Sequence, residues 1–164
     1  MLTAPAAPAK PFRATHFADG NGARSLDFAA AKQRDYVARD LARTTGRTVY
    51  TSQWQPTPQS LLLDKGWVPE AHIVPGLDDG DYITISVVVE NSYELYDDVT
   101  TTFEHVRIPA PPDEDDETAF DAWQYEHIHA LTGVGHTDGD SWYDVTVTAC
   151  SDESLLGREF TFGY

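Results

Sequence analysis

The sequence contains little cysteine, methionine or lysine, and the first of these scarcities excludes several classes of protein. Its 164 residues include one cysteine, one methionine and three lysines. The single cysteine, Cys150, cannot form an internal disulfide, and no cysteine cluster is present to hold a structural zinc ion. No apolar run approaches the roughly 18 residues that a membrane-spanning helix needs. The N-terminus lacks the apolar segment of a secretory signal peptide, so a cytoplasmic protein is predicted.

Basic residues are scarce over most of the chain. Lysine and arginine together number 11 against 27 acidic residues, which gives a net charge of −16. Residues 1–47 carry eight basic and four acidic side chains, whereas residues 48–164 carry three basic and 23 acidic ones. Such an acidic body repels nucleic acid and attracts basic surfaces. The predicted partner is therefore a basic surface of another protein, with no direct nucleic-acid binding by the acidic body and no membrane contact.

The composition and the hydrophobic pattern predict one α+β domain behind an extended arm. Hydrophobic residues make up 41% of the chain and charged residues 23%, as in ordinary globular domains. Pro5, Pro8 and Pro11 predict that residues 1–24 form a flexible N-terminal arm. Residues 25–164 are predicted to form a single acidic domain, with a basic helix at 25–45 and an acidic body at 48–164. The fold expected is an antiparallel sheet of about five strands with two main helices packed on it.

The helix predicted for residues 25–45 is amphipathic and basic. Ser25 is placed as its N-cap, and Gly46 follows its end. The predicted apolar stripe consists of Leu26, Ala30, Val37 and Leu41. The remaining helix surface is predicted to carry Lys32, Arg34, Arg39 and Arg43 into solvent.

Alternating apolar residues predict strands at 47–54, 82–90, 99–108, 143–149 and 158–162. In the first, Tyr50 and Trp54 share one face, and in the second, Ile83, Ile85, Val87 and Val89 do. A β-bulge is expected near His105 in the third, and Tyr143, Val145 and Val147 are expected to point inward in the fourth. Residues 57–66 are predicted as a short helix and the proline-containing segment after it as a loop. The second main helix is expected to run from the acids at 113–117 to about Leu131. Its predicted buried residues are Phe120, Trp123, His127 or Ile128, and Leu131.

No motif in the sequence identifies a reaction. His127 and His129 point about 200° apart on a helix, so they cannot both bind one metal ion. Gly133 and Gly135 follow a helix rather than precede one, which does not fit a phosphate-binding loop. Acidic neighbours raise the pKa of the Cys150 thiol, and no G-x-S-x-G pattern occurs. The prediction is a non-enzymatic protein with no catalytic residues, no metal site and no cofactor.

Clustered carboxylates are the remaining candidate for function. Three groups stand out, and the first two flank the strand predicted at 82–90, which separates them by roughly 30 Å. Carboxylates on that scale could imitate the phosphates of a short duplex. The predicted partner-binding residues are Asp78, Asp79, Asp81, Glu90, Glu94, Asp97, Asp98, Asp113, Glu114, Asp115, Asp116, Glu117 and Asp121.

The leading hypothesis is an acidic protein-interaction protein that inhibits a nuclease or defence enzyme by occupying its nucleic-acid site. One alternative is a small enzyme or ligand-binding domain that uses residues 127–140 and loop aromatics such as Trp142. In this segment His136, Asp138 and Asp140 follow the two earlier histidines. Another is an assembly subunit, a homo-oligomer included, whose basic N-terminal segment docks on the acidic body of a neighbour. A third is that the acids only keep the fold soluble.

Overall fold

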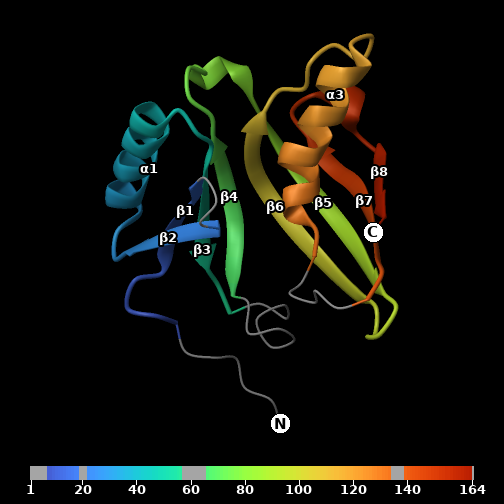
Figure 1. The fold of residues 1–164 in the computed structure, drawn as a ribbon, viewed down its shortest axis with the longest axis horizontal. Coiled ribbons are helices and arrows are strands. Elements are labelled where there is room, and N and C mark those ends of the chain that lie inside the picture. The colour runs from blue at the N-terminus through green and yellow to red at the C-terminus, as the bar shows by residue number, and fades with distance from the viewer. Residues whose placement is uncertain (1–6, 19–21, 57–65, 134–138, 164) are drawn as a thin grey trace. The chain divides into compact units, whose positions relative to one another are not determined.

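The structure, a computed structural model, describes residues 7–18, 22–56, 66–133 and 139–163 (Figure 1). The chain forms two units, Met1–Asp79 and Gly80–Tyr164, named unit 1 and unit 2 here. Eight strands are found among the described residues, four in each unit. The predicted sheet of about five strands was therefore wrong. The short helix predicted at 57–66 lies almost wholly outside the described residues.

In unit 1, four antiparallel strands carry one helix. The strands are β1 (Phe12–Ala18), β2 (Gly22–Phe28), β3 (Val49–Trp54) and β4 (Trp67–Ile73), in the order β2-β1-β3-β4. Helix α1 (Ala31–Thr45) connects β2 to β3 (Figure 1). The core that α1 forms with the strands contains Ala14, Ala38, Ala42 and Val49. Alanines at these positions allow the helix and β1 to approach closely.

Two predictions in unit 1 were wrong for a common reason. Residues 12–18 and 22–24 were expected in an extended arm, but they belong to strands β1 and β2, which pair as an antiparallel hairpin. Ser25 was expected to cap a helix, but its hydroxyl lies 2.9 Å from that of Thr15 on the neighbouring strand, and α1 begins only at Ala31. The hairpin buries little large apolar surface, so hydrophobic alternation does not reveal it.

The segment from Trp67 to Ile73 was expected to be a loop because it contains Pro69. It is strand β4, and Pro69 pairs with Ser52 at a shift in the β3–β4 register. Proline is tolerated at such an irregularity, since an N–H that would continue the ladder is not required there. The prediction that Tyr50 and Trp54 share one face of β3 agrees with the strand alternation observed.

Unit 2 is a second antiparallel group of strands, in the order β6-β5-β7-β8. These are β5 (Tyr82–Tyr93), β6 (Val99–Pro109), β7 (Ser141–Cys150) and β8 (Glu159–Gly163). The bulge expected near His105 is confirmed by a register shift between β5 and β6 and by the positive φ of 57° at His105. The backbone N–H of His105 donates to the Ser86 hydroxyl at 3.1 Å.

A helical segment connects β6 to β7 in unit 2 (Figure 1). It consists of α3 (Glu117–Trp123), the π-helical turn η2 (Gln124–Ile128) and the 3₁₀ turn η3 (His129–Leu131). The expected buried residues Phe120, Trp123 and Leu131 are buried. Both His127 and Ile128 are buried as well. The wider π turn allows this, because it advances fewer degrees per residue than an α-helix and brings both side chains inward.

The buried face of the unit 2 strands is strongly apolar. Ile83, Ile85, Val87 and Val89 of β5 are buried as predicted, and Phe160 and Phe162 of β8 are also buried. The residues of β7 that were expected to point inward, Tyr143, Val145 and Val147, are buried. Asn91 is a buried polar residue of β5: its amide nitrogen donates to the Val99 carbonyl at 2.8 Å, and its amide oxygen accepts from the Gly133 N–H at 2.9 Å.

Candidate partner-binding surface

Charge is divided unequally between the two units. Unit 1 contains nine basic and eight acidic residues, a net charge of +1. Unit 2 contains two basic and 19 acidic residues, a net charge of −17 over its 85 residues. The sequence analysis placed the change from net positive to net negative charge after residue 47, whereas the boundary between the two units lies after Asp79. The acidic field belongs to unit 2.

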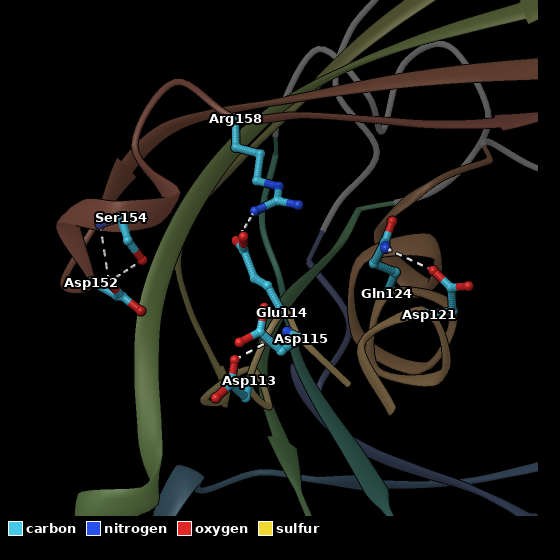
Figure 2. A network of polar contacts seen from close by, with 8 residues as sticks. All are labelled: Asp113, Glu114, Asp115, Asp121, Gln124, Asp152, Ser154 and Arg158. Carbon is cyan, nitrogen blue, oxygen red and sulfur yellow. Dashed lines mark hydrogen bonds and ion pairs between the residues drawn. The ribbon is translucent and has the colours of Figure 1, made fainter. Parts of the chain in front are cut away.

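Both cations of unit 2 are engaged inside that unit. Arg158 forms an ion pair with Glu114 (Figure 2). Its guanidinium also lies 4.7 Å from the centre of the Phe120 ring. The Arg107 guanidinium lies 4.2 Å from the centre of the Tyr82 ring. Neither arginine neutralises more than a small part of the acidic surface. Most carboxylates of unit 2 therefore keep their charge toward solvent.

All thirteen predicted partner-binding acids are exposed in the structure. Asp81 and the acids around the start of α3 lie at the same end of the unit 2 strands, because the Ala110 N–H donates to the Asp81 carbonyl at 2.8 Å. We name these residues of unit 2 the α3 acidic cluster: Asp81, Asp113, Glu114, Asp115, Asp116, Glu117 and Asp121. Asp78 and Asp79, at the end of unit 1, directly precede it in sequence.

Part of the α3 acidic cluster stabilises the helix. The Asp116 side chain caps α3 by accepting from the Ala119 N–H at 3.1 Å. The Asp113 carboxylate accepts from the Asp115 N–H at 3.0 Å, and the Asp121 carboxylate accepts from the Gln124 amide at 3.3 Å (Figure 2). Acidic side chains near a helix N-terminus stabilise the helix. These bonds leave the Asp115 carboxylate as an exposed group with no capping function.

The second predicted group lies at the opposite end of β5. Glu90 is near the end of that strand, and Glu94, Asp97 and Asp98 belong to the β5–β6 loop. Glu94 fixes this loop to the segment before β7: its N–H donates to the Asp140 carbonyl, and its carboxylate accepts from the Asp140 N–H. We name Glu90, Glu94, Asp97 and Asp98 the hairpin acidic cluster. Asp81 and Glu90, nine residues apart along the chain, are separated by about 30 Å if the strand is fully extended.

Sequence reasoning missed the acids of the solvent-facing side of the unit 2 strands. Asp144 of β7 lies directly opposite Glu90 of β5. The exposed Trp142 lies on the same face, two residues before Asp144. The signal was available, because Tyr143 and Val145 were expected to point inward and strand alternation then directs Trp142 and Asp144 outward. Asp152, which binds both the N–H and the hydroxyl of Ser154, was also missed (Figure 2).

The histidines of the helical segment are packed among aromatic rings. His127 lies against Trp123, and His129 contacts the rings of Tyr143 and Phe162. Burial lowers the pKa of both histidines, and the Glu126 carboxylate opposes this effect at His127 to a smaller extent. His136 and Asp138 lie outside the described residues. Within the described part of the chain, no group of three histidine, cysteine or acidic side chains is placed to hold a metal ion.

The lowered pKa of His127 predicts a loss of stability in mild acid. Above pH 6.5 the histidine is neutral in both the folded and the unfolded chain; below it, the unfolded chain takes up the proton first. The stability contributed by neutral His127 should therefore fall by at most about 1.4 kcal/mol for each pH unit below its unfolded pKa. Urea unfolding at pH 7.5 and 5.5, for the native chain and His127→Gln, measures this. An equal loss in both proteins would assign the titration to other groups.

Cys150 is not activated as a nucleophile. Burial raises the pKa of its thiol, the backbone N–H of Asp152 at 3.4 Å opposes this, and the Asp152 charge adds to the increase. The raised pKa agrees with the increase that was expected from the acidic neighbours of Cys150. A thiol with a raised pKa is mostly protonated at neutral pH.

Comparisons with protein-family models, with curated proteins and with solved structures gave no match to this chain. Among the described residues, the structure contains no helix that is long and apolar enough to cross a membrane.

Proposed function

We propose that unit 2 binds the basic nucleic-acid site of another protein and thereby inhibits a nuclease or a defence enzyme, without catalysis of its own. The observation that carries this proposal is the concentration of charge: a net −17 in unit 2, with both of its arginines engaged internally. A cation-lined groove that receives phosphates is the surface such a field would attract. The proposal places this encounter in the cytoplasm.

The dimensions of the acidic surface support imitation of nucleic acid. Carboxylates lie at both ends of β5, and the distance from Asp81 to Glu90 along an extended strand is about 30 Å. Phosphates recur about every 3.4 Å along one strand of duplex DNA, so this span corresponds to roughly nine of them. A partner whose groove accepts a short duplex could therefore meet both acidic clusters at once.

The test removes charge from one cluster without disturbing the cap of α3. In the double variant Asp115→Asn, Asp121→Asn, the Asp116 cap is kept and asparagine can still accept from Gln124. Partners are captured from a native lysate with the unmodified protein, and affinity for the captured protein is then measured with each variant. Two lost rim charges should weaken binding about tenfold at low salt, mainly through the association rate. The effect should shrink as salt rises.

A matched control separates a local contact from the general field. Glu104→Gln combined with Glu159→Gln removes the same charge from exposed positions outside the two clusters. We expect this control to weaken binding less than the double variant at the α3 acidic cluster. Short duplex DNA or RNA should compete with the protein for the captured partner. A partner that binds equally well in excess nucleic acid would rule out the proposed inhibition.

A further inference from the structure

Trp142 is an exposed aromatic side chain that the structure nevertheless holds in one position. It is 51% exposed, yet its indole N–H donates to an Asp144 carboxylate oxygen at 3.2 Å. One part of its ring lies against Gly163 of β8, where a Cβ atom would overlap the indole carbons. The side chain therefore keeps a fixed orientation while about half of its surface faces solvent. Ring surface that is ordered before binding loses little entropy when a partner covers it.

Two carboxylates lie beside this ring on the same face. Asp144 and Glu90 are direct cross-strand neighbours in the β5–β7 register, and Glu90 is diagonal to Trp142. One oxygen of Asp144 accepts from Trp142 and from the Thr161 hydroxyl at 2.9 Å. In the described part of the chain, no cation pairs with Glu90 or Asp144. Like charges directly opposite each other destabilise a sheet, so a cation bound between them would relieve that repulsion.

At two other places in the chain, an aromatic ring and a nearby carboxylate both contact one of the chain's own arginines. In unit 1, Arg13 pairs with Asp27 while its guanidinium lies 3.8 Å from the centre of the Trp67 ring. In unit 2, Arg158 pairs with Glu114 and lies over Phe120. Each site combines an aromatic face, a carboxylate and a guanidinium. Trp142, Asp144 and Glu90 offer the first two groups, and no arginine of the described residues supplies the third.

We propose that Trp142, Asp144 and Glu90 form a notch that binds an arginine side chain on the basic partner. This inference rests on the proposed function, and it assigns one point of contact within the acidic surface. A guanidinium can stack on the open indole face while its N–H groups reach the second oxygen of Asp144 and the carboxylate of Glu90. A lysine ammonium lacks the planar fork and stacks less well, so the notch should prefer arginine.

The experiment uses the whole chain and does not require the natural partner. Labelled protein is titrated with an oligo-arginine peptide, and separately with an oligo-lysine peptide of equal length, at physiological salt. NMR follows the indole N–H signal of Trp142, assigned from its absence in Trp142→Phe. We expect that signal to shift with the arginine peptide, and the Kd for oligo-lysine to be at least about threefold higher.

Variants then test the three members of the notch. Trp142→Ala should raise the Kd for oligo-arginine about fivefold or more, through loss of the stacking surface. Glu90→Gln should raise it about threefold, and it carries little risk to the fold because Glu90 is exposed. The matched control is Glu104→Gln, which removes one exposed charge from outside both acidic clusters instead. Equal effects of Glu90→Gln and Glu104→Gln, or equal binding of the two peptides, would overturn the notch.

The outcomes distinguish this inference from the proposed function. If the captured partner is displaced by nucleic acid but the peptide titration shows no arginine preference, the notch alone is wrong. If the notch binds oligo-arginine selectively but nucleic acid does not displace the partner, the proposed inhibition alone is wrong. Self-association of the chain that Glu90→Gln disrupts would identify a second copy, rather than a different protein, as the occupant, and would overturn the assignment to a basic partner.

Discussion

Replacement of Trp123 by alanine is expected to destabilise the protein by about 3–5 kcal/mol, the largest effect we expect in unit 2. Trp123 is 5% exposed, and its ring contacts Phe120, His127 and Phe160. Its indole N–H also donates to the Pro109 carbonyl at 2.9 Å. The substitution leaves a cavity between α3 and the strands and removes the donor from a buried carbonyl. Urea unfolding followed by circular dichroism measures the change.

Trp123→Phe separates the cost of the cavity from the cost of the lost hydrogen bond to Pro109. Phenylalanine keeps an aromatic ring in the site but cannot donate to Pro109, so we expect a loss of about 1–3 kcal/mol. A loss in Trp123→Ala below 1 kcal/mol would show that the helical segment contributes little to the stability of unit 2. That result would contradict the packing seen around α3.

The strands of unit 2 could be predicted because each carries its own pattern. Ile83, Ile85, Val87 and Val89 alternate over one strand, and Phe160 and Phe162 repeat the pattern at the end of the chain. In β6 the change of parity marked the bulge that His105 occupies. These signals are local, since a strand buried on one face must place apolar residues at every second position.

Strands β1 and β2 of unit 1 were missed because the core beneath them uses small residues. Ala14 is fully buried against Ala38 and Ala42, and neither β1 nor β2 contains a run of large alternating side chains. The Asp19–Gly22 segment has the composition of a hairpin turn, but without apolar alternation on both sides it was assigned to an arm. Strand β4 was missed for a different reason, since Pro69 indicated a loop. Hydrophobic periodicity underestimates strands that pack through alanine.

At the candidate site, the sequence predicted which acids are exposed but not which residues are neighbours in space. That the thirteen acids are exposed follows from their charge, and it was predictable. That Glu90 lies opposite Asp144 was not, because β5 and β7 are separated by β6 and the helical segment in the sequence. Only the strand order brings these carboxylates and Trp142 onto one face. Likewise, Arg34 was predicted on a solvated helix face, although it is 4% exposed.

The position of Arg34 leads to the second large expected effect, in unit 1. From α1, its guanidinium pairs with Asp35 at 2.9 Å and Glu70 at 2.5 Å, and donates to the Ser52 carbonyl at 2.9 Å. One side chain thus connects the helix to β3 and β4. Arg34→Met keeps the length of the side chain but removes the charge, leaving the Ser52 carbonyl and Glu70 without this partner. We expect a loss of about 2 kcal/mol, because the Ser52 carbonyl loses a charged donor and Glu70, whose side chain is 32% exposed, loses its buried partner.

Hydrogen exchange can locate this effect, because it reports on single amides rather than on the whole chain. In Arg34→Met, the amides of α1 and β3 should exchange faster than in the native protein. Arg34→Lys is the matched control: it keeps one charge but loses the planar fork, so exchange should accelerate less than in Arg34→Met. The reason is that a lysine ammonium can reach either Glu70 or the Ser52 carbonyl but cannot bind both with the fixed geometry of a guanidinium. Unchanged exchange in Ala31–Thr45 of Arg34→Met would mean that the apolar core of Ala14, Ala38, Ala42 and Val49 holds α1 without this ion pair.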